Sequence, residues 1–340
     1  MADYKGIKGF KVQSLASDPS NALVGEIWYN TTSSALKYGA PTVAAWSASG
    51  TCPTSFEEGG GGGTQSAGWQ TGGYTGSNST ATNNYDGTSW TSSGTLATGR
   101  ANFGSGGPQT AGIVVGGQTD PTPESATVEV YNGSTWASGT AYPVGVNSCI
   151  GTTGPSSATL VAGGHLGPPG KTDQTATYNG TAWTVSPGTL TPARDRNYIT
   201  GITTAALSVC GRPQTPGAYL NTCLSWDGTS WSSEANYPIA AMTSVATAGP
   251  STEALSWGGN EYPGTKHAES NKYDGTSWSA LPAIPATVAG QGAVANAPSG
   301  VGADGNSFSG GGSVGGTAAT GLTFNWDAPT AATAKTVTVS

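Results

Sequence analysis

The sequence predicts an all-β protein, a six-bladed β-propeller preceded by a short N-terminal β-hairpin. The first observation is a motif of the form aromatic–Asp/Asn–Gly–small–small–Trp, which occurs five times. Its leading aromatics are 46, 47, 48 and 47 residues apart, and a fixed period of this size decides the fold. The second observation is composition: Gly makes up 54 of 340 residues and charged residues only 9%. The aromatics that recur in register supply the apolar material that a disordered chain lacks.

Each copy of the motif combines a turn with two aromatic side chains. Asp-Gly and Asn-Gly are common two-residue hairpin turns, because glycine adopts the positive φ that such turns need. We therefore expect strand, two-residue turn, strand, with the aromatics filling the outer space between blades. Burying one such ring is worth roughly 2–3 kcal/mol. The structural repeat positions are Tyr85 and Trp90, Tyr131 and Trp136, Tyr178 and Trp183, Trp226 and Trp231, and Tyr273 and Trp278.

The rest of each repeat completes a blade. A pair of glycines, or a glycine after another small residue, follows a short apolar run and precedes a loop that differs between repeats. In the second repeat we expect strands at about residues 101–105, 112–117, 126–131 and 135–142. Four short antiparallel strands in about 47 residues match a propeller blade. The glycine run at 59–63 fits either backbone freedom or close packing in the innermost strand of the first blade.

Two segments are expected, an N-terminal attachment segment at residues 1–36 and the propeller at residues 37–340. The repeats fall near 46–90, 91–136, 137–183, 184–231, 232–278 and 279–327, with a closing strand at 328–340. A ring must close to hide its edge strands. We expect the strand around Trp46 to complete the last blade, which lacks the Asp-Gly turn. The C-terminal strand then lies outside it or pairs with the N-terminal hairpin.

Charge and cysteine content exclude several classes of function. The net charge of −7 leaves no basic face for nucleic acid. The four cysteines form no zinc-binding pattern, so we expect neither a metal nor another cofactor. Cys210 and Cys223 fall on neighbouring strands, and both a disulfide and two buried thiols remain open. The N-terminus has no signal-peptide pattern, and no stretch is apolar for long enough to span a membrane.

The repeated order of apolar run, Gly-Gly, loop, Tyr, turn and Trp resembles the kelch repeat over residues 46–327. Cys210-Gly211 and Phe324 depart from the pattern. The opening stretch, residues 4–13 with Trp28-Tyr29-Asn30, is similar to that of virion proteins of marine bacteriophages. This resemblance implies a virion protein made in the host cytoplasm: a tail fibre, a tail-associated adhesin or a capsid decoration. It implies other virion proteins as partners of the N-terminal segment, a homo-oligomer within the particle, and host surface polysaccharide as a ligand.

Enzymatic readings are weaker than a binding function. Galactose-oxidase-like propellers share the repeat but need a copper site with histidine ligands, and the two histidines, His165 and His267, fall in loops two blades apart. Sialidase-like propellers use three arginines, whereas only Arg194 and Arg196 share a loop here. We expect no catalytic residue, and a glycan-processing enzyme ranks behind an adhesin and a decoration protein.

The variable loops are the candidate binding surface. In a propeller the loops between the second and third strands share one face, and repeat proteins place variation on the functional face. Unlike loops also arise simply where nothing constrains them, and both interpretations stay open. The candidate ligand-binding residues are Tyr74, Gln118, Asp120, His165, Lys171, Arg212, Tyr219, Asn260, Tyr262 and His267.

Overall fold

The computed structural model shows an all-β chain. It describes residues 12–20, 22–23, 25–40, 44–54, 57–149, 152–168, 170–215, 219–289, 307–310, 313–314, 323–327 and 333–337, and these residues contain strands and turns but no helix. The chain forms two compact units. One combines Met1–Ala44 with Ala328–Ser340, and the other is Ala45–Asp327.

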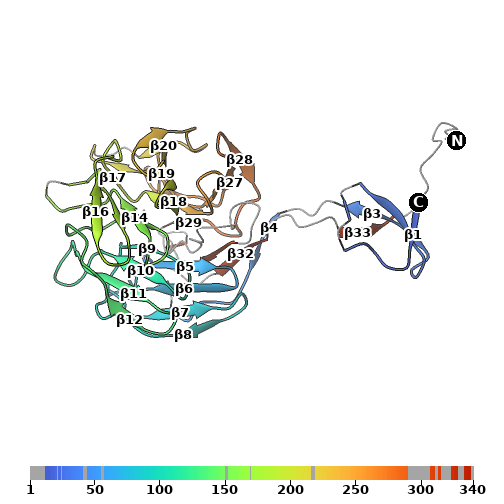
Figure 1. Cartoon of the computed structure of the whole chain (residues 1–340), viewed down its shortest axis with the longest axis horizontal. Helices are drawn as coiled ribbons and strands as arrows, with labels where there is room; N and C mark the ends of the chain where they lie inside the picture. The colour runs from blue at the N-terminus through green and yellow to red at the C-terminus, as the bar shows by residue number, and fades with distance from the viewer. Residues whose placement is uncertain are drawn as a thin grey trace. The chain divides into compact units, whose positions relative to one another are not determined.

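The larger unit consists mainly of small antiparallel sheets, as expected for a propeller-like fold (Figure 1). The first three sheets have four strands each: β5 (Gly60–Thr64) to β8 (Trp90–Ser92) through β6 (Ala67–Thr71) and β7 (Thr82–Tyr85); β9 (Gly104–Gly106) to β12 (Trp136–Ser138) through β10 (Gly112–Val115) and β11 (Val128–Tyr131); and β13 (Thr152–Thr153) to β16 (Trp183–Ser186) through β14 (Thr159–Ala162) and β15 (Thr175–Tyr178). The four strands predicted in the second repeat are therefore confirmed.

The fourth sheet is larger. Its four repeat strands are β18 (Tyr198–Ile202), β19 (Ala205–Pro213), β20 (Leu220–Trp226) and β21 (Trp231–Ser233). Four short strands extend it: β17 (Arg194–Asp195), β22 (Met242–Thr243), β25 (Asn260–Glu261) and β26 (Thr265–Lys266). The fifth sheet contains β23 (Ala246–Ala248), β24 (Leu255–Trp257), β27 (Ser270–Tyr273) and β28 (Trp278–Leu281).

The strand that begins the larger unit pairs with the strand that ends it. β4 (Ala45–Ala48) lies beside β32 (Thr323–Asp327), which also pairs with β30 (Ser307–Gly310), and Trp46 stands opposite Trp326. The predicted pairing of the Trp46 strand with the last repeat is confirmed. It supplies the outer tryptophan that the last repeat lacks in sequence. A separate pair is formed by β29 (Val288–Ala289) and β31 (Ser313–Val314).

The smaller unit contains both ends of the chain. Its sheet runs β1 (Gln13–Leu15), β2 (Ile27–Asn30), β3 (Ala35–Ala40) and β33 (Thr333–Thr336). The expected boundary at residue 36 thus falls within β3, and the C-terminal strand pairs with the N-terminal hairpin rather than within the larger unit. The reason is register: β3 pairs with β2 through residues 35–38 and with β33 through residues 37–40. The two pairings overlap at Lys37 and Tyr38, so a boundary at residue 36 would divide one sheet between two units.

Each aromatic motif forms a four-residue loop rather than the expected two-residue turn. Tyr131 pairs directly with Trp136, and the two rings stack with centroids 4.8 Å apart. Glycine has a positive φ as expected, for example +102° at Gly87. The loop is longer because its first residue caps it: Asp86 Oδ1 accepts the backbone N–H groups of Thr88 and Ser89 at 2.9 and 2.8 Å. Asn132 and Asn179 make the same bonds in their repeats.

The outer tryptophans also join neighbouring sheets. In four cases the indole N–H donates to a hydroxyl on the first residue of the third strand of another sheet. The pairs are Trp136 with Thr82, Trp231 with Thr175, Trp46 with Ser270 and Trp90 with Thr323, at 2.8–2.9 Å. Trp183 and Trp278 donate instead to the carbonyls of Thr140 and Ala235. The predicted packing role of these aromatics is therefore accompanied by a directional bond.

Glycine brings the innermost strands together. A Cβ at Gly60 would collide with Phe103 and Ser105 of the next sheet, and one at Gly62 would collide with the carbonyl of Gly107. Ser105 Oγ instead accepts the N–H of Gly61 at 2.8 Å. Of the two interpretations of the glycine run, close packing is the one observed. The innermost strands contact one another in chain order, β5 with β9, then β13, β18 and β23.

All four cysteines are buried and free. Cys210 and Cys223 therefore form no disulfide. Burial raises the pKa of the Cys149 and Cys223 thiols to about 12 and that of Cys52 to about 11, which disfavours the reactive thiolate.

The indole–hydroxyl bond can be tested at Trp231 and Thr175. We expect Trp231→Phe and Thr175→Val each to lower the free energy of unfolding by about 1 kcal/mol, because each removes one partner of a single hydrogen bond. The double variant should cost less than the sum of the two in urea denaturation. Thr184→Val, an exposed threonine in the same sheet, is the control. Strict additivity would contradict the proposed coupling.

The capped loops predict a defined acid sensitivity. Hydrogen bonds from Ser89 and Thr88 hold the pKa of Asp86 well below its usual range, and those from Ser230 and Thr229 do the same for Asp227. A lowered folded-state pKa contributes stability above the unfolded value of about 3.9, which is lost as the pH falls toward the folded value. Asp274 caps its loop in the same way, through the N–H groups of Thr276 and Ser277, and its pKa is also lowered. The triple variant Asp86→Asn, Asp227→Asn, Asp274→Asn keeps the capping oxygens. Its urea midpoint should fall less between pH 5 and pH 2 than that of the wild type, and an equal fall would refute this account.

Candidate functional site

Five of the predicted binding residues occupy one equivalent position. Each immediately follows the glycine pair, or Cys210-Gly211 in the fourth repeat, and forms a backbone bridge with the segment that leads into an innermost strand. The pairs are Tyr74 with Glu57, Gln118 with Ala101, His165 with Asn147, Arg212 with Asp195 and Asn260 with Thr243. Positive φ at the glycines, such as +66° at Gly116 and +98° at Gly117, turns the chain into this position. The variable loops are therefore held at the edge where the innermost strands begin.

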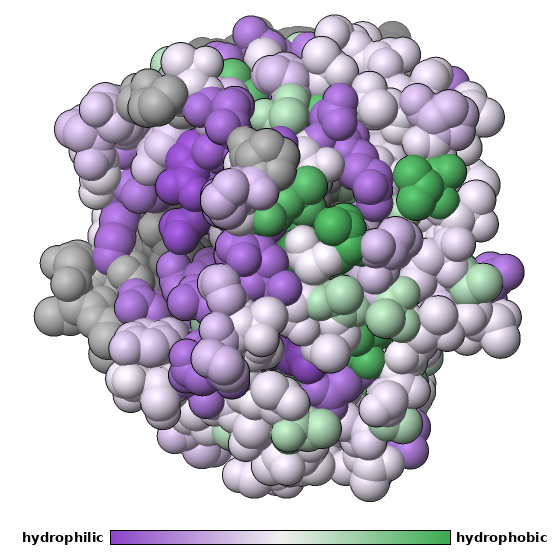
Figure 2. Space-filling view, turned by 90° about the vertical axis from the view of Figure 1, so that its left-hand side faces the viewer, coloured by the Kyte–Doolittle hydropathy of each residue, from purple (hydrophilic) through white to green (hydrophobic). Residues whose placement is uncertain are grey.

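A pocket of about 340 Å³ lies among the loops of the third, fourth and fifth sheets. Four of the predicted residues line it: Lys171, Arg212, Tyr219 and Tyr262. Its volume falls in the range of small-molecule sites, about 300–1,000 Å³. Figure 2 shows one face of the molecule, on which hydrophilic residues gather around a hollow beside a smaller hydrophobic patch.

On the cationic side of the pocket, Arg212 is held in place by a buried carboxylate. Arg212 donates from Nε and Nη2 to the two carboxylate oxygens of Asp195, at 2.9 and 2.6 Å. The Asp195 side chain is fully buried, whereas the Arg212 side chain is 37% exposed. The hydrogen bonds to Asp195 raise the pKa of Arg212. This two-point contact orients the guanidinium and leaves its remaining edge at the pocket.

Lys171 supplies a second cation. Partial burial lowers the pKa of its ammonium, an effect that Asp195 opposes and Arg212 and Arg196 reinforce. Its backbone N–H donates to Gln214 Oε1 at 2.9 Å, which joins the loops of the third and fourth sheets. Among the described residues, the Lys171 ammonium donates no side-chain hydrogen bond, and Lys171 lines the pocket beside Arg212.

Two tyrosines form the aromatic side. The rings of Tyr219 and Tyr262 meet edge to face, with centroids 5.6 Å apart and planes at 79°. Tyr262 is 49% exposed although it packs against another ring. Aromatic rings with a polar tip, held at the rim of a concave site, suit ligands that are apolar on one side and polar on the other.

The other predicted residues lie outside this pocket. Tyr74, Gln118 and Asp120 are exposed, and Asn260 is half-buried. His165 lies 3.6 Å from Glu124. His267 lies between two carboxylates, 3.0 Å from Glu261 and 2.9 Å from Glu269.

Sequence reasoning missed several residues of this surface. Gln214 lies in the variable loop that contains Arg212 and Tyr219, so loop position alone would have included it. Asp195 carried no signal of its own, because its role follows from bridging across strands to Arg212. Arg194, weighed as part of a carboxylate clamp, is buried and donates to the carbonyls of Cys210 and Thr222, so it is not available to a ligand.

Within the described part of the chain, no three His, Cys, Asp or Glu side chains converge as metal ligands would. The same residues include no helix long and apolar enough to cross a membrane. The chain matches no protein-family model and no curated protein.

The Asp195–Arg212 pair predicts an asymmetric response to mutation. Arg212→Ala leaves a buried carboxylate without its partner and should lower the free energy of unfolding by about 3–5 kcal/mol. Asp195→Ala should cost less, because water can solvate the half-exposed guanidinium. The double variant should be no less stable than Arg212→Ala. Thermal or urea unfolding tests this order, and a larger cost for Asp195→Ala would contradict it.

Proposed function

We propose that this protein is a non-enzymatic surface component of a bacteriophage particle, of the tail-fibre or adhesin type, that binds an acidic saccharide of the host surface. The observation that carries the binding function is the pocket in which Lys171 and Arg212 face the Tyr219–Tyr262 pair. The cations suit a carboxylate or sulfate group, since guanidinium and ammonium groups bind such oxygens through charge-assisted hydrogen bonds. The tyrosines suit the carbon face of a sugar ring. The particle assignment rests on the resemblance of the N-terminal stretch and of the repeats.

The proposed scaffold is a closed, six-bladed, kelch-like propeller. In this scheme the last blade contains β30, β32 and β4. It is bonded to the fifth sheet through Trp46 and Ser270 and to the first sheet through Trp90 and Thr323. A closed ring would hold the variable loops of all blades on one rigid face, which suits recognition by several loops at once.

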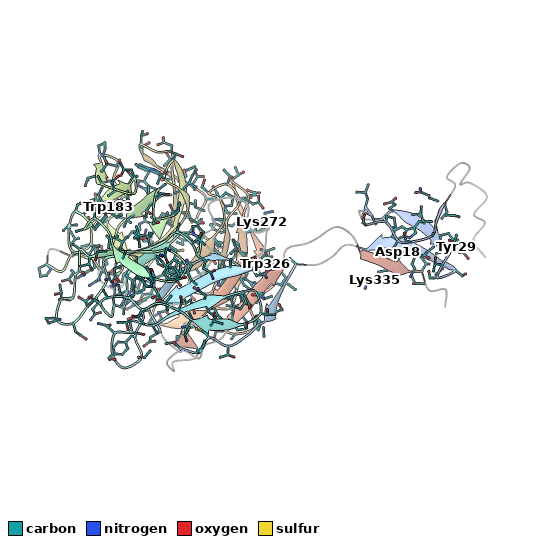
Figure 3. The ribbon with its side chains drawn as sticks, turned by 60° about the horizontal axis from the view of Figure 1, so that its bottom comes forward. Asp18, Tyr29, Trp183, Lys272, Trp326 and Lys335 are labelled. Carbon is teal, nitrogen blue, oxygen red and sulfur yellow. The ribbon has the colours of Figure 1, made fainter. Side chains whose placement is uncertain are left out.

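The smaller unit supports attachment to a neighbouring protein of the particle. Ile27 pairs with Tyr38 and Tyr29 with Leu36, and all four side chains are exposed on one face of the sheet. Figure 3 labels Asp18, Tyr29 and Lys335 in this unit. The opposite face is closed by Trp28, whose indole N–H donates to Asp18 Oδ1 at 3.0 Å. A contiguous exposed apolar patch is typical of an interaction surface.

That patch favours a second candidate function, particle decoration through contacts with virion subunits alone. Photocrosslinking from position 29 in intact particles shows whether this patch contacts another virion protein or is exposed to solvent. Cross-links to another virion protein support attachment, and their absence counts against it.

Glycan-array binding of the full chain tests the proposed function. We expect the wild type to bind glycans that carry uronic or sialic acids, and Lys171→Ala to weaken this binding about tenfold, equivalent to about 1.4 kcal/mol. Tyr262→Ala should weaken it without loss of folding, since that ring is half-exposed. Lys335→Ala in the smaller unit makes the same charge change at an exposed site and is the matched control. If the wild type binds no acidic glycan, or if both lysine variants behave alike, the proposed site is wrong.

A further inference from the structure

A series of five polar residues lies where the innermost strands of the first five sheets begin. One residue with positive φ precedes the innermost strand of each of the first five sheets: Glu58, Asn102, Ser148, Arg196 and Ser244. The backbone N–H of Asn102 donates to the carbonyl of Glu58, that of Ser148 to Asn102, that of Arg196 to Ser148, and that of Ser244 to Arg196, at 2.6–3.1 Å.

None of these five positions is glycine, although the chain is rich in it. Glycine adopts positive φ without the steric cost that other residues bear. A backbone requirement alone would therefore favour glycine at all five. Residues held in such conformations cluster at ligand sites, so the side chains at these positions call for a function of their own.

Three of the five side chains meet. Asn102 Nδ2 donates to Glu58 Oε2 at 2.6 Å, and Arg196 Nη2 lies 3.3 Å from Glu58 Oε1. They precede the innermost strands of the second, first and fourth sheets, so the cluster joins sheets that are not consecutive in the chain. Glu58 and Arg196 remain about one-third exposed, at 30% and 31%, whereas Asn102 is 7% exposed.

Two polar atoms of the cluster, Asn102 Oδ1 and Arg196 Nε, are buried and have no hydrogen-bond partner among the residues that the structure describes. A buried polar group without a partner is costly, and such groups in native structures are usually satisfied by water, an ion or a ligand. The cluster therefore offers a free acceptor and a free donor beside a carboxylate that solvent can reach.

This combination selects the chemistry of the ligand. The negative charge of Glu58 would repel a simple anion, and the positive charge of Arg196 would repel a metal ion. A neutral hydroxyl group meets neither objection, because it can donate to Asn102 Oδ1 or Glu58 and accept from Arg196 Nε. Adjacent hydroxyl groups of a sugar ring would satisfy both orphaned atoms at once.

We propose that Glu58, Asn102 and Arg196 form a second subsite, which binds a neutral sugar residue of the saccharide whose acidic residue enters the loop pocket. This inference rests on the proposed function. The two subsites are joined through the chain, since Arg196 follows Asp195, and Asp195 is ion-paired with Arg212 of the pocket. The protein would thus bind at least two sugar residues of the acidic glycan, one in each subsite.

Saturation-transfer NMR on the full chain tests this subsite. The probes are the neutral methyl glycosides of galactose, glucose, mannose, fucose and N-acetylglucosamine, with methyl galacturonoside as the acidic probe. The variants are Glu58→Gly and Asn102→Gly, which remove the side chain while relieving the backbone cost of positive φ, so folding should be preserved. Ser148→Gly changes the equivalent positive-φ position of the third sheet, outside the cluster, and is the control.

We expect at least one neutral glycoside to bind the wild type and Ser148→Gly with equal affinity. The same glycoside should bind Glu58→Gly and Asn102→Gly about tenfold more weakly. Lys335→Ala, in the smaller unit, should leave the binding of the neutral probe unchanged, and Lys171→Ala should weaken the binding of the acidic probe. The proposed subsite would be wrong if no neutral glycoside binds, or if Glu58→Gly and Asn102→Gly bind the glycoside as tightly as the wild type does. If the neutral probe behaves as expected but the acidic one does not bind, the subsite stands and the proposed acidic pocket fails.

Discussion

The structure depends on one repeated interaction: the outer tryptophan packs against its partner ring, stacked or tilted, and donates its indole N–H to a neighbouring sheet. Stacking alone would hold the ring within its own sheet, as in the Tyr131–Trp136 pair. The bonds from Trp136 to Thr82 and from Trp231 to Thr175 fix one sheet against the next. Each four-stranded sheet is too small to bury its own faces, so the fold requires these contacts between sheets. The same bond recurs from Trp90 to Thr323, between the first and last sheets.

This arrangement separates the aromatic scaffold from the variable loops that form the candidate binding surface. The aromatic motifs are nearly identical in sequence and serve packing, and their Asp or Asn residues are occupied in capping the loops. The loops beyond the glycine pairs are free of that requirement. They place Lys171, Arg212, Tyr219 and Tyr262 around one pocket, in which Arg212 is paired with the buried carboxylate of Asp195. In a chain with a net charge of −7, two cations placed at one pocket are a local feature, and the binding function that we propose would account for it.

The sequence could predict what repeats. The repeat of about 47 residues and its pattern of apolar runs and glycines predicted the all-β fold and the four strands of the second repeat. They also predicted that the Trp46 strand pairs with the last repeat. They did not give the four-residue loop, because the capping bonds of Asp86 depend on backbone geometry rather than on the Asp-Gly pair alone. The position of β3 and β33 in one sheet was left open, since either end of the chain could supply an edge strand. Tyr219 and Tyr262 were chosen from loop variability, whereas Glu58, Asn102 and Arg196 were not, because their meeting depends on strands far apart in sequence.

The central claim is that a ligand binds on the face of the variable loops and not at the aromatic motifs. Hydrogen–deuterium exchange of the full chain, with and without an oligogalacturonate, measures this most directly. The account predicts protection of backbone amides in residues 165–173, 212–219 and 260–267, with no change in residues 85–90 and 131–136. Protection confined to the aromatic motifs, or no protection in any of the three loops, would contradict it.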